Sequence, residues 1–258
     1  MLQENDLYGA TTARYYDAAY AVLRRRSADV DFYRSLAREV GGPVLELGCG
    51  SGRVLLPIAR DGFTCTGLDA SSDMLERLQR KDPPADLRLV QGRMESFDFG
   101  SERFALIYSA FRAFQHLITI DEQLACLAAV RRHLAPRGLF AFDVFAPRLQ
   151  RIAVREEPET EDARFEIDGE EIIRYASVLR DPATQVMDVT FRYERRRRGS
   201  VIGNDLVRTR MRYFFRYELE HLLARAGFAK VSVFGGFDRR PYDYVSGETV
   251  IVASADGG

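Results

Sequence analysis

The sequence has little cysteine and little histidine, which limits disulfide and metal chemistry. Among 258 residues there are three cysteines and three histidines. The cysteines at positions 49, 65 and 126 are too few and too scattered for a disulfide framework, and no C-x-x-C pair marks a zinc site. We therefore expect neither a disulfide framework nor a bound metal ion.

Long apolar runs and a strong net charge are also absent. No stretch of 18 apolar residues occurs, and the first six residues, MLQEND, have neither the basic start nor the apolar stretch of a signal peptide. The 37 basic and 38 acidic residues give a formal net charge of -1, so no overall field would draw the protein to nucleic acid or to an anionic membrane. We expect a cytoplasmic protein without a nucleic-acid or membrane partner.

The remaining composition is that of an ordinary folded protein. Hydrophobic residues make up 46% and charged residues 29% of the chain, close to average globular usage. A length of 258 residues suits one large α/β domain, or such a domain with a sizeable insertion.

Hydrophobic spacing up to residue 147 predicts alternating helices and strands. Residues 1–40 have apolar positions at helical spacing and predict two helices, which Gly41, Gly42 and Pro43 end. Short apolar runs predict strands at 44–47, 64–68, 87–91, 104–109 and 138–144. The segments between them predict helices at 52–61, 72–81 and 121–134. This order is typical of βαβ units, and hence of a parallel sheet covered by helices on both faces.

A different pattern follows residue 147. From 164 to 215 apolar and polar residues alternate between turn signals such as Asp168-Gly169 and Arg198-Gly199, which predicts three or four antiparallel strands. A helix at 216–226 and strands at 229–235 and 249–254 resume the α/β pattern. The predicted organisation is a helical segment at 1–40, an α/β core at 41–147 and 216–258, and an antiparallel β insertion at 148–215.

A glycine-rich segment after the first predicted strand is the most informative part of the sequence. The run VLELGCGSGR at 44–53 leads from a strand into a turn with glycines at 48, 50 and 52, and then into a helix. Glycine permits positive φ and lets a ligand approach the backbone, while a helix start offers free N–H groups. The alternative, a tight turn without a ligand, needs one glycine rather than three. A nucleotide-like ligand is therefore favoured.

Acidic residues around this turn indicate which nucleotide. Glu46 stands two residues before Gly48, where a carboxylate would repel a pyrophosphate. A nicotinamide-binding fold prefers G-x-G-x-x-G, and here Arg53 occupies the position of the third glycine. Asp69, at the end of the second strand, can accept hydrogen bonds from both ribose hydroxyls. A ligand with a ribose and an ammonium group but no pyrophosphate fits S-adenosylmethionine.

In these residues the chain resembles the class I S-adenosylmethionine-dependent methyltransferases, and within them the bacterial small-molecule branch. The matching motifs are ELGCGSGR at 46–53, GLDAS at 67–71 followed by ML at 74–75, QGRM at 91–94, FALI at 104–107 and LAPRG at 134–138. The resemblance covers about residues 10 to 145 together with the closing helix and strands. It implies a Rossmann-like α/β fold and S-adenosyl-L-methionine as the cofactor.

The resemblance also implies which residues bind this cofactor. The implied contacts are the ammonium group for Glu46, the methionine part for Gly48 and Gly50, the ribose for Asp69, and the adenine for Ala70, Met74 and Met94, with Cys49 and Arg53 completing the turn. Arg93 departs from the family, because many relatives have an aspartate there that accepts from the adenine amino group, and a guanidinium cannot accept. Either the backbone at Arg93 or Glu95 takes that role, or adenine recognition is looser.

Aromatic side chains are expected around the transferring methyl group, because an aromatic face stabilises a sulfonium cation by about 0.5 to 2 kcal/mol. Tyr15, Tyr16 and Tyr20 lie on the first predicted helix. The resemblance implies that residues 1–40 form a lid, with Tyr15 in contact with the cofactor and Tyr16 in the catalytic site. The alternative is that these tyrosines only pack the helix against the fold.

The loop after the fourth predicted strand should border the methyl donor, because ligands bind at the carboxyl ends of the strands of such sheets. Ala110 and Phe111 are expected to contact the cofactor. His116 is the candidate general base, since imidazole titrates near neutral pH, and the alternative is a capping or packing histidine. His133 and His221 are expected to be structural.

The antiparallel insertion resembles those of glycine and amino-sugar N-methyltransferases, which roof the acceptor pocket or form a subunit contact. A homodimer through this insertion is one expected assembly. Strand alternation would turn about half of its candidate substrate-facing residues to solvent. These candidates are Arg174, Tyr175, Arg192, Tyr193, Arg212 and Tyr213.

The sequence thus predicts a methyltransferase that moves a methyl group from S-adenosylmethionine to a nitrogen or oxygen of a small-molecule acceptor by in-line displacement. Such a reaction gains most from holding donor and nucleophile in near-attack geometry, so a base is optional. Two other functions stay open: a non-catalytic module that binds S-adenosylmethionine or a partner, and a nucleotide-dependent oxidoreductase.

Overall fold

The computed structural model describes residues 9–23 and 28–255, and the chain divides into two compact units. The antiparallel unit consists of Met1–Ser27 and Leu149–Arg212. The core unit consists of Ala28–Arg148 and Tyr213–Gly258. Each unit is therefore built from two separate stretches of the chain.

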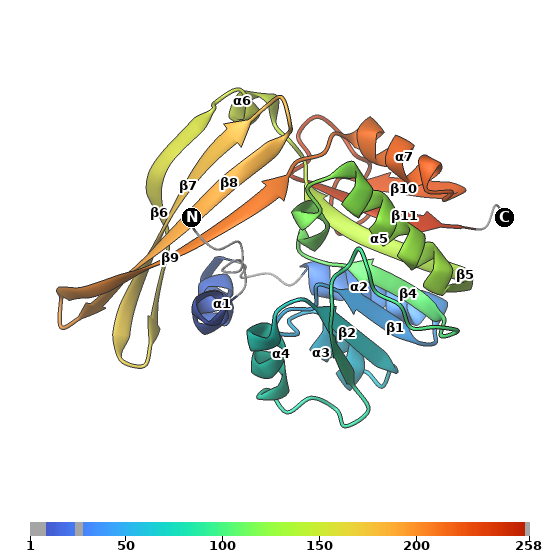
Figure 1. Ribbon diagram of the computed structural model, residues 1–258, viewed down its shortest axis with the longest axis horizontal. Coiled ribbons are helices and arrows are strands. Elements are labelled where there is room, and N and C mark those ends of the chain that lie inside the picture. Colours follow the sequence, from blue (N-terminus) through green and yellow to red (C-terminus); the bar gives the residue numbers. More distant parts are fainter. Residues whose placement is uncertain (1–8, 24–27, 256–258) are drawn as a thin grey trace. The chain divides into compact units, whose positions relative to one another are not determined.

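The core unit contains a seven-stranded sheet in the order β10-β11-β5-β4-β1-β2-β3 (Figure 1). The strands are β1 (Val44–Leu47), β2 (Cys65–Asp69), β3 (Arg88–Gln91), β4 (Phe104–Ser109), β5 (Leu134–Phe145), β10 (Lys230–Phe234) and β11 (Glu248–Ser254). Strands β1 to β5 are parallel, and β11 is antiparallel to both β5 and β10. The strand order reverses between β1 and β4, and ligands of doubly wound sheets bind outside the carboxyl ends at this point.

Helices cover both faces of this sheet, as predicted. The helices are α2 (Ala28–Val40), α3 (Leu55–Arg60), α4 (Ser72–Gln79), α5 (Ile120–His133) and α7 (Arg216–Arg225). Residues of α5 and α7 share one hydrophobic cluster with Leu45 and Leu47, and residues of α2, α3 and α4 share another with Val44. Because side chains alternate along a strand, Glu46 lies on the same face of the sheet as α2.

The antiparallel unit is a four-stranded sheet in the order β6-β7-β8-β9, packed against one helix. Its elements are α1 (Ala10–Leu23), α6 (Leu149–Ile152), β6 (Glu156–Ile167), β7 (Glu170–Asp181), β8 (Val186–Arg197) and β9 (Ser200–Arg212). Helix α1 contacts β6 and β9, and its Tyr15 and Ala19 pack with Phe165, Tyr193 and Val207 in the core of this unit.

Several boundaries differ from the predicted ones. The helix expected at 52–61 is reduced to α3, because Gly52 takes a φ of 80° and the next two residues form a turn. The strand expected at 138–144 already begins at Leu134. The segment 1–40 is split between the units, because α1 buries Tyr15 against the antiparallel sheet whereas α2 buries Leu36 in the core unit.

Candidate active site

Three segments that the sequence marked for ligand binding meet at one edge of the core sheet. Gly48 directly follows β1, Asp69 is the last residue of β2, and Ala110 directly follows β4. Strand β1 pairs in parallel with both β2 and β4, so the carboxyl ends of the three strands are neighbours. This edge includes the β1/β4 switch point, where a ligand is expected in such a sheet.

Each glycine of the turn is required by its own backbone and neighbours. Gly48, Gly50 and Gly52 have φ values of 72°, 52° and 80°. A Cβ on Gly48 would lie 2.9 Å from the Ala113 Cβ, and one on Gly52 would lie 2.7 Å from the Leu78 Cγ. The glycines thus determine the shape of the turn. The charged residues around the turn indicate which kind of ligand would bind there.

Asp69 connects this turn to the end of β2 by hydrogen bonds. Its Oδ2 accepts a hydrogen bond from the Gly50 N–H at 2.7 Å, and its Oδ1 accepts one from the Ser71 N–H at 2.8 Å. Burial raises the pKa of the Asp69 carboxyl, and the two backbone donors oppose that rise. A carboxylate has about four acceptor positions, so Asp69 retains capacity for the hydroxyls of a ribose.

Glu46 places a buried carboxyl two residues before the first glycine. It is 3% exposed, and the Tyr108 hydroxyl donates a hydrogen bond to its Oε2 at 2.9 Å. Burial raises the pKa of Glu46 to about 8, although the Tyr108 hydrogen bond and the charge of Arg53 act against that rise. A buried carboxyl of this kind gains much from a cationic partner, such as an ammonium group.

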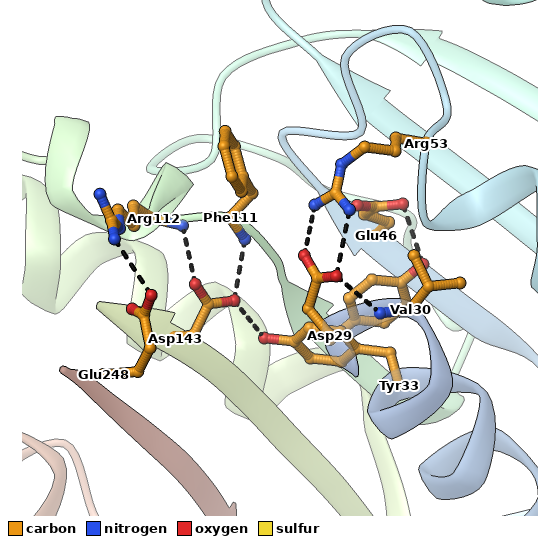
Figure 2. A network of polar contacts seen from close by, with 10 residues as sticks. Asp29, Val30, Tyr33, Glu46, Arg53, Phe111, Arg112, Asp143 and Glu248 are labelled. Carbon is orange, nitrogen blue, oxygen red and sulfur yellow. Dashed lines mark hydrogen bonds and ion pairs between the residues drawn. The ribbon is translucent and has the colours of Figure 1, made fainter. Parts of the chain in front are cut away.

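Arg53 connects the glycine turn with α2 and with the loop after β4. Asp29, at 1% exposure, accepts hydrogen bonds from its Nη1 at 3.1 Å and its Nη2 at 2.5 Å (Figure 2). The guanidinium also lies over the Phe111 ring, 4.8 Å from its centroid. Arg53, which the sequence assigned to cofactor binding, is therefore oriented by an acidic and an aromatic neighbour.

A second buried carboxyl, Asp143 of β5, belongs to the same region. It accepts hydrogen bonds from the Tyr33 hydroxyl at 2.7 Å and from the Phe111 and Arg112 N–H groups at 2.8 and 3.2 Å (Figure 2). Asp143 is fully buried, and burial raises its pKa to about 6 while these donors and the charge of Arg112 act against the rise. The Tyr33 ring stacks on Tyr108 with 4.7 Å between centroids, which links Asp143 to the partner of Glu46.

Sequence reasoning missed the partners of this network, which are Asp29, Tyr33, Tyr108 and Asp143. A signal existed for Asp143, because it interrupts the apolar run FAFDVF at 140–145. An ionisable group inside a strand that is buried on both faces is costly unless it is hydrogen-bonded, so it indicates a partner. For Asp29 and Tyr33, which lie on an ordinary amphipathic helix, no comparable signal stands out.

The two methionines predicted at the adenine border the glycine turn. The Met74 Cε would lie 3.2 Å from a Cβ on Gly50, and the Met94 Sδ would lie 3.9 Å from one on Gly48. Cys49, in contrast, is 4% exposed and its side chain belongs to the core cluster, so only its backbone can face a ligand. Burial also raises the pKa of the Cys49 thiol well above its usual value.

The remaining adenine-side residues are more exposed. Ala70 is exposed, and its carbonyl accepts a hydrogen bond from the Gln91 side chain at 3.2 Å. The guanidinium of Arg93 forms an ion pair with Glu95. Of the two side chains considered for adenine recognition, Glu95 is thus the one with acceptor atoms, and Arg93 orients it.

The loop after β4 holds Ala110, Phe111 and the candidate base. Ala110 is 3% exposed, and the half-buried His116 ends a short 3₁₀ helix, Ala113–His116. His133 is fully buried and contacts backbone atoms at both ring nitrogens, the Phe99 N–H at 2.9 Å and the Ala129 carbonyl at 2.8 Å. His133 therefore has a structural role, and His116 remains the candidate at this edge.

The prediction that Tyr15 contacts the cofactor is wrong. Tyr15 is 0% exposed, stacks on Tyr193 with 4.4 Å between centroids, and donates a hydrogen bond to Asp205. Its ring is needed to pack α1 on the antiparallel sheet, so the packing alternative holds for this residue. Tyr16 is half-buried, its ring lies 4.6 Å from that of Tyr20, and its predicted catalytic role stays a prediction.

Two of the candidate substrate-facing residues in the insertion are likewise interior residues of the antiparallel unit. Arg174 is 3% exposed, pairs with both Asp162 oxygens at 2.8 Å, and lies over the Phe191 ring. Tyr193 is also 3% exposed, within the cluster around Tyr15. Both side chains are buried inside this unit, so neither is presented to solvent.

The part of the chain that the structure describes contains neither a candidate metal cluster nor a candidate membrane-spanning helix. Within 9–23 and 28–255, no group of three or more His, Cys, Asp or Glu side chains could hold a metal ion. Over the same residues, no helix has the length and apolar character needed to cross a membrane.

Known proteins similar to this chain include several methyltransferases. Residues 44–138 match a family described as a methyltransferase domain. An uncharacterized methyltransferase of Synechocystis sp. is 36% identical over 42% of this chain and 49% of its own length. The dTDP-3-amino-3,4,6-trideoxy-alpha-D-glucopyranose N,N-dimethyltransferase of Streptomyces venezuelae is 32% identical over 52% of this chain and 56% of its own length. The chain thus matches about half the length of these curated relatives.

A solved structure matches this chain over nearly its full length. The CcbJ methyltransferase from Streptomyces caelestis superposes with a TM-score of 0.81 at 27% identity, covering 99% of this chain and 100% of that one. The family match spans β1 to the start of β5, which are the strands that carry Glu46, the glycine turn and Asp69. The strand order, the turn and the matched residues agree: residues 44–138 form a methyltransferase domain, and the chain is similar to S-adenosylmethionine-dependent methyltransferases.

Proposed function

We propose that this protein transfers the methyl group of S-adenosylmethionine to an amino group of a small-molecule acceptor, with a hydroxyl as the second candidate nucleophile. The observation that carries the proposal is the buried Glu46 carboxyl beside a glycine turn that Asp69 fastens. These two carboxyls suit a ligand with an ammonium group and a ribose, and their negative charge would repel a pyrophosphate. The name of the Streptomyces venezuelae relative, an amino-sugar dimethyltransferase, supports nitrogen as the first choice.

The cofactor, when bound, supplies a methyl group on a positively charged sulfur, which is already activated for displacement. The residues of this chain then bind and orient. Glu46 pairs with the ammonium group, Asp69 accepts from the ribose, and the thioethers of Met74 and Met94 contact the adenine. Phe111 offers an aromatic face to positive charge, and the backbone of Gly48 and Gly50 admits the ligand because no Cβ stands in the way.

On the acceptor side, the proposed residues are His116 and Tyr16. His116 lies in the loop that carries Phe111, and it would take a proton from an amine that arrives protonated. Tyr16 would orient the acceptor. Replacing His116 with Gln should lower kcat and steepen its dependence on pH, whereas Tyr16→Phe should mainly raise KM. A homodimer through the insertion at 148–215 is part of the same proposal, and light scattering after size exclusion tests it.

The proposal is tested by calorimetric titration of the full chain with S-adenosylmethionine, its demethylated product and NAD. Binding of the first two, weakened at least tenfold by Asp69→Asn and not by Glu102→Gln, supports the proposal. Glu102 is a suitable control because it is an exposed carboxylate that pairs with Arg88. Binding of NAD alone would point to the oxidoreductase alternative.

Turnover separates an enzyme from a module that only binds. The demethylated product should accumulate when the protein is incubated with S-adenosylmethionine and a panel of amino sugars and other small amines. Tight cofactor binding without product on any amine or hydroxyl acceptor would favour the non-catalytic alternative.

A further inference from the structure

The backbone directly after β4 takes an unusual conformation. Phe111 and Arg112 have φ values of 56° and 66°, in the left-handed region that residues other than glycine seldom adopt. Each such residue costs free energy and persists only when its surroundings hold it there. Two of them in succession, at the sheet edge that carries the glycine turn, require an explanation.

Asp143 supplies the support for both residues. From β5, its Oδ1 accepts from the Phe111 N–H at 2.8 Å and its Oδ2 accepts from the Arg112 N–H at 3.2 Å (Figure 2). The carboxylate is fully buried, so water does not replace these bonds. The Tyr33 hydroxyl donates to the same Oδ1 at 2.7 Å and fixes the orientation of the carboxylate from α2.

The conformation held in this way decides where the Phe111 ring lies. The ring is in contact with the guanidinium of Arg53, which in turn is held by both oxygens of Asp29. The two supports act on different parts of Phe111, since Asp143 fixes its backbone and Arg53 its ring. The ring therefore has a defined place next to the glycine turn that ends at Arg53.

We infer that Asp143 is a positioning residue, which through the backbone N–H groups of Phe111 and Arg112 places the Phe111 ring for recognition of the positively charged cofactor. This inference rests on the proposed function. Asp143 itself is shielded from any ligand, so its effect is transmitted by the backbone. A side chain at 143 that accepts fewer hydrogen bonds loosens the Phe111 ring without removing it.

Three variants separate this role from a general loss of structure. Asp143→Asn keeps the size of the side chain but leaves one acceptor oxygen for three donors, so at least one backbone N–H loses its partner. Tyr33→Phe keeps the ring stack on Tyr108 and removes only the hydroxyl that orients Asp143. Glu248→Gln is the matched control, because Glu248 accepts from the Arg112 side chain at 3.1 Å, whereas Asp143 accepts from the Arg112 backbone.

The first measurement is amide hydrogen exchange of residues 110–117 in the protein without ligand. The Phe111 and Arg112 amides should exchange slowly in the unaltered protein and in Glu248→Gln, and at least tenfold faster in Asp143→Asn. Tyr33→Phe should show an intermediate rate. Equal rates in Asp143→Asn and the unaltered protein would overturn the inference.

The second measurement compares the affinity for S-adenosylmethionine with that for its demethylated product, whose sulfur is uncharged. Loss of one cation–π contact corresponds to about a two- to thirtyfold loss of affinity. Asp143→Asn should weaken binding of the charged compound by that factor relative to the uncharged one, and Glu248→Gln should not. A purely structural role would weaken both equally, and that outcome would also overturn the inference.

A rescue variant tests the backbone route directly. Glycine adopts positive φ without strain, so Arg112→Gly added to Asp143→Asn should restore most of the preference for the charged compound. Failure of this rescue would show that Asp143 acts by another route. If the unaltered protein bound neither compound, the proposed function would fail and the inference with it, a result distinct from unchanged selectivity in the variant.

Discussion

Binding of the cofactor should release a proton from Glu46. The carboxyl is buried with a pKa of about 8, so at pH 7 about ten molecules are protonated for each one that is ionised. An ammonium group placed beside it favours the carboxylate and returns the pKa toward its ordinary value of about 4.3. Complex formation at pH 7 should therefore expel about 0.9 proton per site.

The sign and size of the pH dependence follow from this linkage. Each proton that must leave opposes binding, so the affinity rises with pH until the pH reaches the pKa of Glu46 in the free protein. Between pH 6 and pH 7 the rise should be about tenfold, or about 1.4 kcal/mol. The α-amino group of the cofactor, with an ordinary pKa of about 7.7 to 8.0, stays largely protonated in this window.

Calorimetry in buffers of different ionisation enthalpy measures the proton directly. The heat of binding to the unaltered protein should vary with the buffer, whereas Glu46→Gln should abolish that variation along with the pH slope between pH 6 and 7. Glu102→Gln, a change at an exposed carboxylate, should behave as the unaltered protein does. A slope that survives in Glu46→Gln, or none in the unaltered protein, would refute Glu46 as the ammonium partner.

Three further predictions concern stability. Tyr15→Ala removes a fully buried ring that stacks on Tyr193, and it should destabilise the antiparallel unit by about 3 to 5 kcal/mol in urea unfolding. Gly52→Ala places a Cβ 2.7 Å from the Leu78 Cγ at a φ of 80°, and thermal unfolding should reveal a loss of more than about 1 kcal/mol. The pKa of Asp143 rises from 3.8 to about 6 on folding, so the unfolded chain loses this proton at lower pH than the folded protein. The free energy of unfolding should therefore fall by about 2 kcal/mol between pH 4 and pH 6, and urea titrations of Asp143→Asn should lack this part of the decrease.

The α/β core could be predicted from the sequence because its signals are local. A strand such as Val44–Leu47 is buried over its whole length and reads as a short apolar run, and the turn after it reads as three spaced glycines. The ends of helices were harder to predict from the sequence. Gly52, for example, belongs to the turn although its neighbours have helical spacing. Sequence periodicity does not report the backbone φ that ends an element.

The interpretation of Tyr15 failed because the sequence does not reveal what a helix packs against. Tyr15 and Tyr16 are adjacent on α1, and neighbouring residues on a helix point in directions about 100° apart. Which of them is buried depends on the antiparallel strands, more than 140 residues later in the chain. The resemblance led us to expect the side chain of Tyr15 at the ligand, and the structure buries it against the antiparallel sheet instead.

The partners of Asp143 were missed for a related reason. Tyr33 is 110 residues away in the sequence, so no spacing rule joins the two. The interruption of an apolar strand by Asp143 could still have been used, because it indicates a buried carboxyl that must have donors. What no local pattern supplies is that two of those donors are backbone N–H groups at positive φ.

Glu46 and Asp143, two of the buried carboxyls of this site, differ in the number of donors that each receives. Asp143 accepts from three donors, and its pKa of about 6 leaves it mostly ionised at pH 7. Glu46 accepts from the single hydroxyl of Tyr108, and its pKa of about 8 leaves it mostly protonated at the same pH. Asp143 is thus mostly ionised before a ligand arrives, whereas we expect Glu46 to ionise when a cation binds beside it. Burial raises both pKa values, and the larger number of donors opposes that rise more strongly at Asp143. We therefore expect the ionisation of Glu46, rather than that of Asp143, to respond to the ammonium group of a ligand.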